Sequence, residues 1–181
     1  MLRWVGGEPE NGLPVWRLNQ VLTIIQERIQ NISNEGRWAP MVWSVMHMYS
    51  TAQLGKLFAI KRGLDPEFAG LVCAFHDIYT LHTGKWEDHA TNADRYVKDI
   101  AEEYNERWGN KLGMISDKEI ERIINAIRGH SDKVEITNDP YAELLKDVDT
   151  VDAYFHGLEP SETAAGRRKR LNFFFKEFHL Q

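Results

Sequence analysis

Hydrophobic residues recur at spacings of three and four through most of the chain, which is the pattern of a helix with one buried stripe. In segment 18–32, for example, one helical face carries Leu18, Val21, Leu22, Ile25 and Ile29. This pattern, together with its interruptions by glycine and proline, predicts about seven helices. Their expected ranges are 18–32, 41–62, 66–77, 89–108, 117–130, 140–154 and a last helix from about residue 161.

The boundaries of several helices carry recognisable end signals. Gly63 supplies a helix stop, and the dipeptides 65–66 and 139–140 each pair an aspartate cap with a proline at the first helical position. Ser116 and Glu119 have the spacing of a capping box, in which the two side chains satisfy each other's backbone amides. These signals predict sharp starts for three of the helices.

Segments without helical periodicity are short. Residues 79–88 read as a loop directly after the pair His76-Asp77, so this loop is a candidate rim for an active site. The best alternating segment, 133–137, is too short and isolated to build a sheet. The sequence therefore predicts an all-α fold, organised as a single compact helical domain of 181 residues.

Composition narrows the class of protein. Hydrophobic residues make up 43% and charged residues 27% of the chain, which is ordinary globular usage. The net charge of -5 disfavours a nucleic-acid polymer as partner and leaves small anionic ligands open. Cys73 is the single cysteine and is expected to be a buried filler in a reducing compartment. The N-terminus lacks an apolar targeting segment and no run could span a bilayer, so a cytoplasmic protein without membrane contact is expected.

Six histidine and aspartate residues are distributed mostly near predicted helix ends. Imidazole and carboxylate groups are the usual ligands of borderline divalent metals where cysteine is absent. Neighbouring helical residues diverge by about 100°, so His76 and Asp77 can reach one metal together only from a helix end. The six candidates are His47, His76, Asp77, His89, His130 and Asp149.

The order of these residues resembles the HD-domain superfamily of metal-dependent phosphohydrolases, over about residues 41–152. The family's first histidine resembles His47 in SVMHMYSTAQLGKLFA, and its adjacent histidine and aspartate resemble His76 and Asp77 in LVCAFHDIYT. The last aspartate of the family is similar to Asp149 in KDVDTVDAY, with Asp147 as the alternative. The resemblance implies that His47, His76, Asp77 and Asp149 bind a divalent metal.

Two further histidines resemble additions found in some members of the superfamily. His89 in KWEDHATNADRY and His130 in NAIRGHSD are expected to bind a second metal or to contact phosphate. They are 41 residues apart, a longer interval than expected for many relatives, and residues 104–113 look like the extension. Two histidines with two aspartates suit Mn, Fe, Co, Ni, Zn or Mg, so the sequence predicts one or two divalent ions of unresolved identity.

A metal site of this kind implies hydrolysis of a phosphate ester, and the resemblance implies a nucleotide or a related small phosphorylated substrate. Phosphate oxygens that do not meet the metal need cationic partners. The expected partners are Lys85 first, then Arg128, with Arg37 or Lys56 as further candidates.

Proton transfer during such a reaction needs a group that can accept or release a proton. Asp77, Glu87 and Asp88 are the candidates for this role.

Other interpretations of the same residues stay open. His47 lies between two methionines and could be a core histidine, and His76 and Asp77 could form only a hydrogen-bonded pair. The six residues also resemble the ligand set of dinuclear iron oxygenases with this fold, and a non-catalytic regulatory module that binds a nucleotide or metal is the third alternative.

The C-terminal region adds two expectations. Arg167 to Arg170 is expected to form a solvated charged face, and Phe173 to Phe175 with Phe178 to form core packing or a contact in a homodimer.

Overall fold

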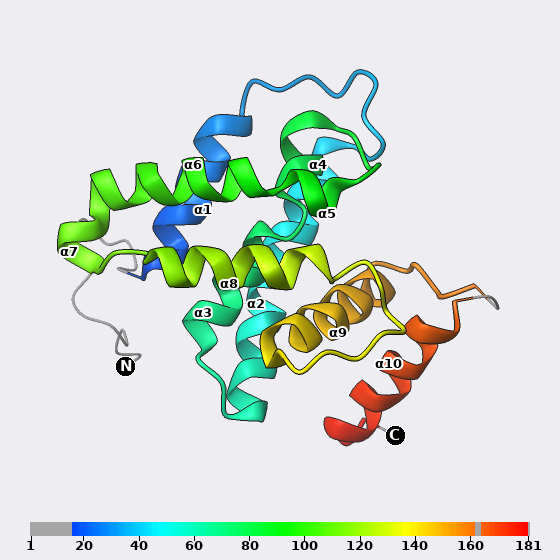
Figure 1. Ribbon diagram of the computed structural model, residues 1–181. Coiled ribbons are helices and arrows are strands. Elements are labelled where there is room, and N and C mark those ends of the chain that lie inside the picture. The colour runs from blue at the N-terminus through cyan, green and yellow to red at the C-terminus, as the bar shows by residue number, and fades with distance from the viewer. Residues whose placement is uncertain (1–15, 162–163, 181) are drawn as a thin grey trace, which may run out of the picture.

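Helices make up the regular structure of the protein in the computed structural model, which describes residues 16–161 and 164–180 (Figure 1). Within these ranges there is no strand, and 133–137 is irregular, so the all-α prediction is confirmed. No helix of the described part is long and apolar enough to cross a membrane. The helices are α1 (Arg17–Ile29), α2 (Met41–Arg62), α3 (Pro66–Phe75), α4 (Ile78–Thr83), α5 (His89–Asn92), α6 (Asp94–Tyr104), the π-helix η2 (Asn105–Gly109), α7 (Asn110–Leu112), α8 (Asp117–Arg128), α9 (Pro140–Phe155) and α10 (Ala165–Glu177).

The predicted end signals form in the structure. Gly63 takes the left-handed conformation with φ 67°, which glycine adopts without strain, and it ends α2 at the expected residue. The Asp65 carboxylate accepts hydrogen bonds from the first backbone amides of α3. Ser116 and Glu119 form both halves of the capping box at the start of α8. Local hydrogen bonding therefore fixes these boundaries, as the sequence predicted.

The expected loop 79–88 is wrong in its first half, because Ile78–Thr83 forms helix α4. Ile78 and Leu81 are buried in the core, and the Arg37 guanidinium donates to the carbonyl oxygens of Thr80 and Leu81 near the end of this helix. A helix of six residues is too short to display a periodic stripe, so tertiary contacts determine it. The chain bends at His76-Asp77, between α3 and α4, rather than running from a helix into a loop.

The single helix expected over 89–108 is also corrected. It is divided into α5 and α6 at Ala93, and it continues beyond Tyr104 as the π-helix η2 and the short helix α7. The Asn105 side chain hydrogen-bonds both the N–H and the C=O of Ile115. These two bonds fasten the 104–113 extension to the start of α8.

Helix α2 is central to the packing. It contacts α3, α4 and α9, while α9 also packs against α3, α8 and α10. Figure 1 shows α6 and α8 side by side and α10 at one end of the molecule, next to α9. The core between these helices is continuous and includes Cys73, which is fully buried as expected. This arrangement brings residues of α2, α3, α5, α8 and α9 to one interior region.

Gly55 marks the closest approach of α2 and α3. A Cβ atom at this position would lie 2.6 Å from the Cys73 Sγ atom and 3.2 Å from the Ala69 carbonyl oxygen. We therefore expect Gly55→Ala to lower the free energy of unfolding by about 1–3 kcal/mol through overpacking. Urea denaturation measures this change. Gly129→Ala is the control, because a Cβ atom there meets nothing within 4 Å, and equal midpoints for the two variants would contradict the prediction.

Candidate metal centre

All six predicted side chains meet in the interior of the helical assembly. His47 comes from the middle of α2, His76 and Asp77 from the bend between α3 and α4, and His89 from the first residue of α5. His130 follows the end of α8, and Asp149 lies within α9. None of the four histidines is more than 4% exposed, and Asp149 is 8% exposed. Segments more than 100 residues apart thus contribute to one buried cluster.

One half of the cluster surrounds His47 and His76. Their Nε2 atoms lie 3.0 Å apart, and His47 Nε2 is 3.4 Å from Asp149 Oδ1. The Oδ2 atom of Asp77 lies 3.4 Å from His76 Nε2 and 3.7 Å from His47 Nε2. The ligand atoms of His47, His76 and Asp149 are all within 4.8 Å of one another, which is close enough to surround one cation.

The other half of the cluster surrounds His89 and His130. Their Nε2 atoms are 3.2 Å apart. The second oxygen of Asp77, Oδ1, lies 3.4 Å from His89 Nε2 and 3.6 Å from His130 Nε2. Asp77 therefore presents one carboxylate oxygen to each pair of histidines, and the two halves share this residue.

Hydrogen bonds at the far side of each ring fix the tautomers. Nδ1 of His76, His89 and His130 contacts the carbonyl oxygen of the residue three positions earlier, at 2.6, 2.9 and 2.6 Å. A carbonyl oxygen only accepts, so Nδ1 carries the proton and a neutral ring has a lone pair at Nε2. His47 Nδ1 has the corresponding contact with Asp152 Oδ2 at 2.5 Å. Rings held in this way are typical of metal-binding histidines.

The arrangement of polar atoms fits a divalent cation. Pairs of Nε2 lone pairs directed at each other at 3.0 and 3.2 Å repel unless a proton or a cation lies between them. Asp77 Oδ1 is buried and accepts no hydrogen bond from the described residues, which is costly for a carboxylate oxygen. A cation between Asp77 and the imidazoles would satisfy both groups of atoms.

The pKa values of the cluster show the strong coupling of its charges. Burial disfavours a charged His47, but hydrogen bonds to Asp149 and Asp152 outweigh it and raise its pKa to about 10. Burial lowers the pKa of His76 to about 4. Burial alone would raise the pKa of Asp77, but the neighbouring His76 and His130 hold it below its ordinary value. Without a cation, Asp77 and Asp149 are therefore ionised and the His76 ring is neutral, whereas His47 is protonated. A metal ion that binds His47 has to displace this proton.

The structure separates the two aspartates that the sequence left as alternatives. Positions 147 and 149 differ by about 200° around a helix, so they point in different directions. Asp147 Oδ1 accepts a hydrogen bond from Arg170 at 2.6 Å, and Asp147 Oδ2 lies 2.8 Å from an Arg62 nitrogen. Asp149, not Asp147, reaches the histidine cluster.

Two contacts of the cluster were missed by the sequence analysis. The Lys133 ammonium is buried and donates to Asp149 Oδ2 at 2.5 Å and to the His130 carbonyl at 2.6 Å. Asp152 orients His47, as described above. Its spacing of three from Asp149 indicates the same helix face and could have identified it. The segment after α8 offered no comparable signal for Lys133, because its burial depends on α9 and α10.

Tryptophan rings cover two of the histidines. Trp43 stacks on His47 with ring centroids 4.8 Å apart, and Trp86 stacks on His89 at 4.1 Å. Trp38 stacks in turn on Trp86 at 4.4 Å. The sequence analysis gave these residues no role, since their proximity to the cluster arises from the fold alone.

The predicted phosphate-binding cations lie in different surroundings. Lys85 is exposed in the turn after α4, and Arg128 is half exposed and pairs with Asp94. Arg37 and Lys56 are engaged elsewhere, Arg37 with the carbonyls of α4 and Lys56 over the Trp16 ring at 4.5 Å. The phosphate-binding role of these two residues stays a prediction.

Glu87 and Asp88, the alternative proton-transfer groups, are exposed in the turn before α5. Asp77 lies within the cluster itself.

The expected solvated face at Arg167–Arg170 is wrong for Arg170. This side chain is buried, at 8% exposure, and contacts Asp147, Glu143 and the Lys133 carbonyl. Arg167 lies 3.4 Å from Asp149 Oδ2. The basic block therefore includes two residues that attach α10 to the neighbourhood of the cluster.

The fold is all-helical, and its buried histidines and aspartates form a cluster of the kind that could hold a metal ion. The family model described as HD domain matches residues 45–154, which is more than half of the chain. The chain therefore belongs to the HD domain family, part of a superfamily of metal-dependent phosphohydrolases.

A solved structure supports the fold. It is described as a predicted HD superfamily hydrolase from an uncultured Thermotogales bacterium, and it matches 91% of each chain with a TM-score of 0.54. The sequence identity is 19%, so the likeness concerns the fold alone. No curated protein sequence matches the chain at a significant level.

Proposed function

We propose that this protein is a metal-dependent phosphohydrolase that cleaves a small phosphate ester, with a nucleotide as the substrate class. The observation that carries the proposal is the convergence of four imidazole Nε2 atoms on the two oxygens of Asp77. A satisfied core histidine needs no such convergence, and neither does a simple hydrogen-bonded pair of histidine and aspartate. The acidic chain, with a net charge of -5, agrees with a small substrate rather than a nucleic-acid polymer.

In this proposal His47, His76, Asp77 and Asp149 hold one divalent ion. His89 and His130, together with the second oxygen of Asp77, hold another. Such an ion, when bound, lowers the pKa of a coordinated water from 15.7 to roughly 7 and neutralises charge on a phosphoryl oxygen. The identity of the ion is Mn, Fe, Co, Ni, Zn or Mg, since this set of nitrogen and oxygen donors suits several of them.

The residues of the chain then have distinct tasks. Asp152 and the backbone carbonyls fix the ring orientations, and Lys133 holds Asp149 at the cluster. The proton of the reacting water goes to a carboxylate, either Asp77 or one of the exposed acids Glu87 and Asp88 in the turn before α5. Lys85, in its exposed turn, and Arg128, at the end of α8, bind the phosphate oxygens that do not meet metal.

Metal analysis followed by a phosphate-release screen tests this function. The purified chain is stripped of metal and reloaded with each candidate ion, and phosphate release is then measured over nucleotides and simple phosphate esters. We expect release with at least one ion and none from the metal-free protein. Metal binding at the cluster without release from any phosphate ester would count against hydrolysis.

Tryptophan fluorescence reports on each half of the cluster separately. Because Trp43 stacks on His47 and Trp86 on His89, we expect Ni²⁺ or Co²⁺ to quench both indoles as the two halves fill. Trp43→Phe should remove the quenching that belongs to the first half, and Trp86→Phe that of the second. Trp108→Phe, in η2, is the matched control and should retain both. Unquenched fluorescence at saturating metal would contradict metal binding at these histidines.

A second candidate function rests on the same six-residue cluster. Two halves that share a central aspartate also suit a dinuclear iron oxygenase with this fold. Iron near two per chain, with oxygen consumption on a diol-like substrate and no phosphate release, would favour this alternative.

A further inference from the structure

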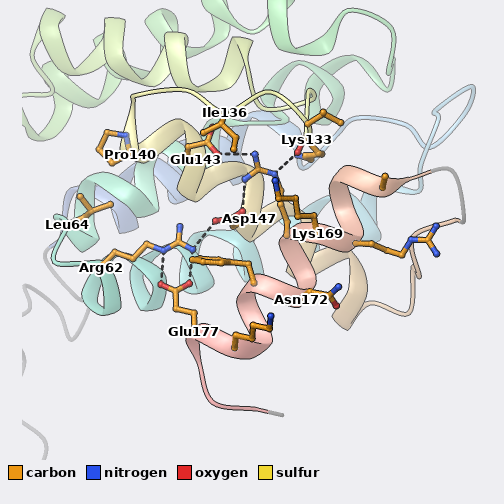
Figure 2. A pocket seen from close by; sticks show the side chains of 16 residues that line it. Arg62, Leu64, Lys133, Ile136, Pro140, Glu143, Asp147, Lys169, Asn172 and Glu177 are labelled. Atoms are coloured by element: carbon orange, nitrogen blue, oxygen red, sulfur yellow. Dashed lines mark hydrogen bonds and ion pairs between the residues drawn. The ribbon is translucent and has the colours of Figure 1, made fainter.

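A pocket of about 1020 Å³ lies away from the metal centre, between α10, the end of α2 and the segment that joins α8 to α9 (Figure 2). Small-molecule sites typically measure about 300–1,000 Å³, so this pocket can take a ligand of that class. None of the six cluster residues lines it. Lys133 lines the pocket and also contacts the cluster.

A network of ion pairs forms one side of the pocket. Asp147 pairs with the guanidinium groups of Arg62 and Arg170, and Figure 2 shows the pair of Asp147 with Arg62. Glu177 pairs with Arg62 at 2.8 Å, and Glu143 pairs with Arg170 at 2.9 Å. Each acidic side chain that lines the pocket is thus already paired with an arginine. The acids therefore leave no unpaired negative charge to repel an anion.

The side formed by α10 combines cations with an apolar ring. Lys169, Asn172, Phe173 and Lys176 lie at spacings of three and four, so they occupy one face of the helix. All four are exposed, and Phe173 is 57% exposed. Phe173 is the member of the predicted aromatic stripe that does not enter the core, whereas Phe174 does.

The segment between α8 and α9 supplies further apolar surface. Val134 and Ile136 are 74% and 72% exposed, although both are large β-branched residues. Together with Phe173 they border the pocket. Apolar side chains that gather at a concave site are typical of ligand binding, whereas single exposed ones are ordinary.

The charge of the pocket is opposite to that of the chain. Six cationic and only three acidic side chains line it, although the whole chain carries a net charge of -5. Arg62 and Arg170 pair with the three acids of the pocket. The excess of positive charge therefore comes from the α10 side, where Lys169 and Lys176 flank Phe173. A locally positive pocket in an acidic protein attracts an anionic ligand.

We propose that this pocket is an effector site for a small anionic amphiphile. The apolar body of the ligand packs against Phe173, Val134 and Ile136, and its anionic group pairs with Lys169 or Lys176. The inference goes beyond the proposed hydrolysis, because it concerns a site that contains none of the metal ligands.

Contacts of Lys133 connect this site to the metal centre. The Lys133 ammonium donates to Asp149 Oδ2, and the Lys133 carbonyl accepts a hydrogen bond from Arg170 Nε at 2.8 Å. A ligand held between α10 and segment 133–136 therefore affects the position of Lys133, which in turn positions Asp149. Occupation of the pocket changes the affinity of the centre for metal, and by linkage metal changes the affinity for the ligand equally.

The test of binding uses 8-anilinonaphthalene-1-sulfonate as the anionic probe and the uncharged N-phenyl-1-naphthylamine as its comparison. Fluorescence titrations are carried out on the full chain without metal, so this arm does not depend on the proposed hydrolysis. Charge reversal in the double variant Lys169→Glu/Lys176→Glu should weaken the sulfonate about tenfold, as the loss of two surface charge contacts implies. The uncharged probe should be affected less than about twofold, and Phe173→Ala should weaken both probes.

The control for charge is Lys118→Glu, an exposed lysine on α8 that does not line the pocket. Equal weakening of the sulfonate by this control and by the double variant would overturn the site. A dimer in sedimentation velocity that excludes both probes and that Phe173→Glu dissociates would also overturn it, by assigning the surface to a second copy of the chain.

The effector role has its own measurement. Calorimetric titration of Mn²⁺ with and without saturating sulfonate probe should give metal affinities that differ by about fivefold, at the lower end of common coupling strengths. The same difference should disappear in the double variant. Probe binding with an unchanged metal affinity would overturn the effector role, and it would leave the proposed hydrolysis unaffected.

Discussion

Asp77→Ala is expected to abolish phosphate release and to remove most of the bound metal, while the helical circular dichroism stays unchanged. Asp77 is the residue that both halves of the cluster share, with one oxygen toward His47 and His76 and the other toward His89 and His130. Its loss removes one ligand from each of the two proposed ions. We expect turnover to fall by at least about 10³-fold, the scale on which preorganised electrostatic stabilisation of this kind contributes to catalysis.

His76→Ala should give the same outcome, because its Nε2 atom lies 3.4 Å from Oδ2 of Asp77 in the first half of the cluster. The measurements are phosphate release at saturating metal and elemental analysis of the purified variants. Asp117→Ala, an exposed aspartate at the start of α8, is the control and should retain both metal and activity. Unchanged turnover in either Asp77→Ala or His76→Ala would refute the proposed mechanism.

Arg170→Ala should produce the largest loss of stability among single substitutions in α10. The guanidinium is buried and holds Asp147, Glu143 and the Lys133 carbonyl at once. Removing it leaves buried acidic and carbonyl oxygens without this partner. Breaking a buried ion pair from one side costs about 3–5 kcal/mol where the remaining charge is uncompensated. Asp147 keeps Arg62 and Glu143 keeps Lys146 as partners, so we expect a loss at the lower end, about 3 kcal/mol.

This change is measured as the free energy of unfolding in urea, on metal-free protein so that metal linkage does not contribute. Lys169→Ala is the control, since Lys169 directly precedes Arg170 in the same helix and is exposed. It should alter stability by less than about 0.5 kcal/mol. A loss below about 1 kcal/mol for Arg170→Ala would show that the network contributes little to the attachment of α10.

Variants of α10 also distinguish charges that stabilise the fold from charges that would bind the ligand. Arg170 belongs to the paired side of the pocket, whereas Lys169 and Lys176 supply the positive charge that the proposed amphiphile meets. Substitution of Arg170 should therefore lower the free energy of unfolding, whereas substitution of the two lysines should weaken binding of the sulfonate probe.

Much of the fold follows from local sequence. The cap at Asp65, the capping box at Ser116 and the stop at Gly63 are satisfied by hydrogen bonds within a few residues, so the printed sequence is sufficient to locate them. The six candidate ligands were also identified in advance, from residue type, spacing and resemblance. Their ligand roles remain a proposal, which the geometry supports.

The errors of prediction share a cause. Helix α4 is too short to show periodicity and is stabilised by burial of Ile78 and Leu81 and by the distant Arg37. Arg170 stands in a basic run typical of a surface, but Asp147 and Glu143 of α9 provide its partners. Each depends on residues far away in the sequence.

The sequence by itself determined the helical class and most helix boundaries, because periodicity and capping are properties of neighbouring residues. Residue type and the family resemblance also identified the six candidate ligands. Only the tertiary structure decided that Asp149 rather than Asp147 reaches the cluster, that Asp77 lies between two pairs of imidazoles, and that Lys133 is buried beside them. Burial and long-range electrostatics decide such questions. They depend on which helices pack together, and the packing of α2 against α9 brings His47 and Asp152, 105 residues apart, into contact at one site.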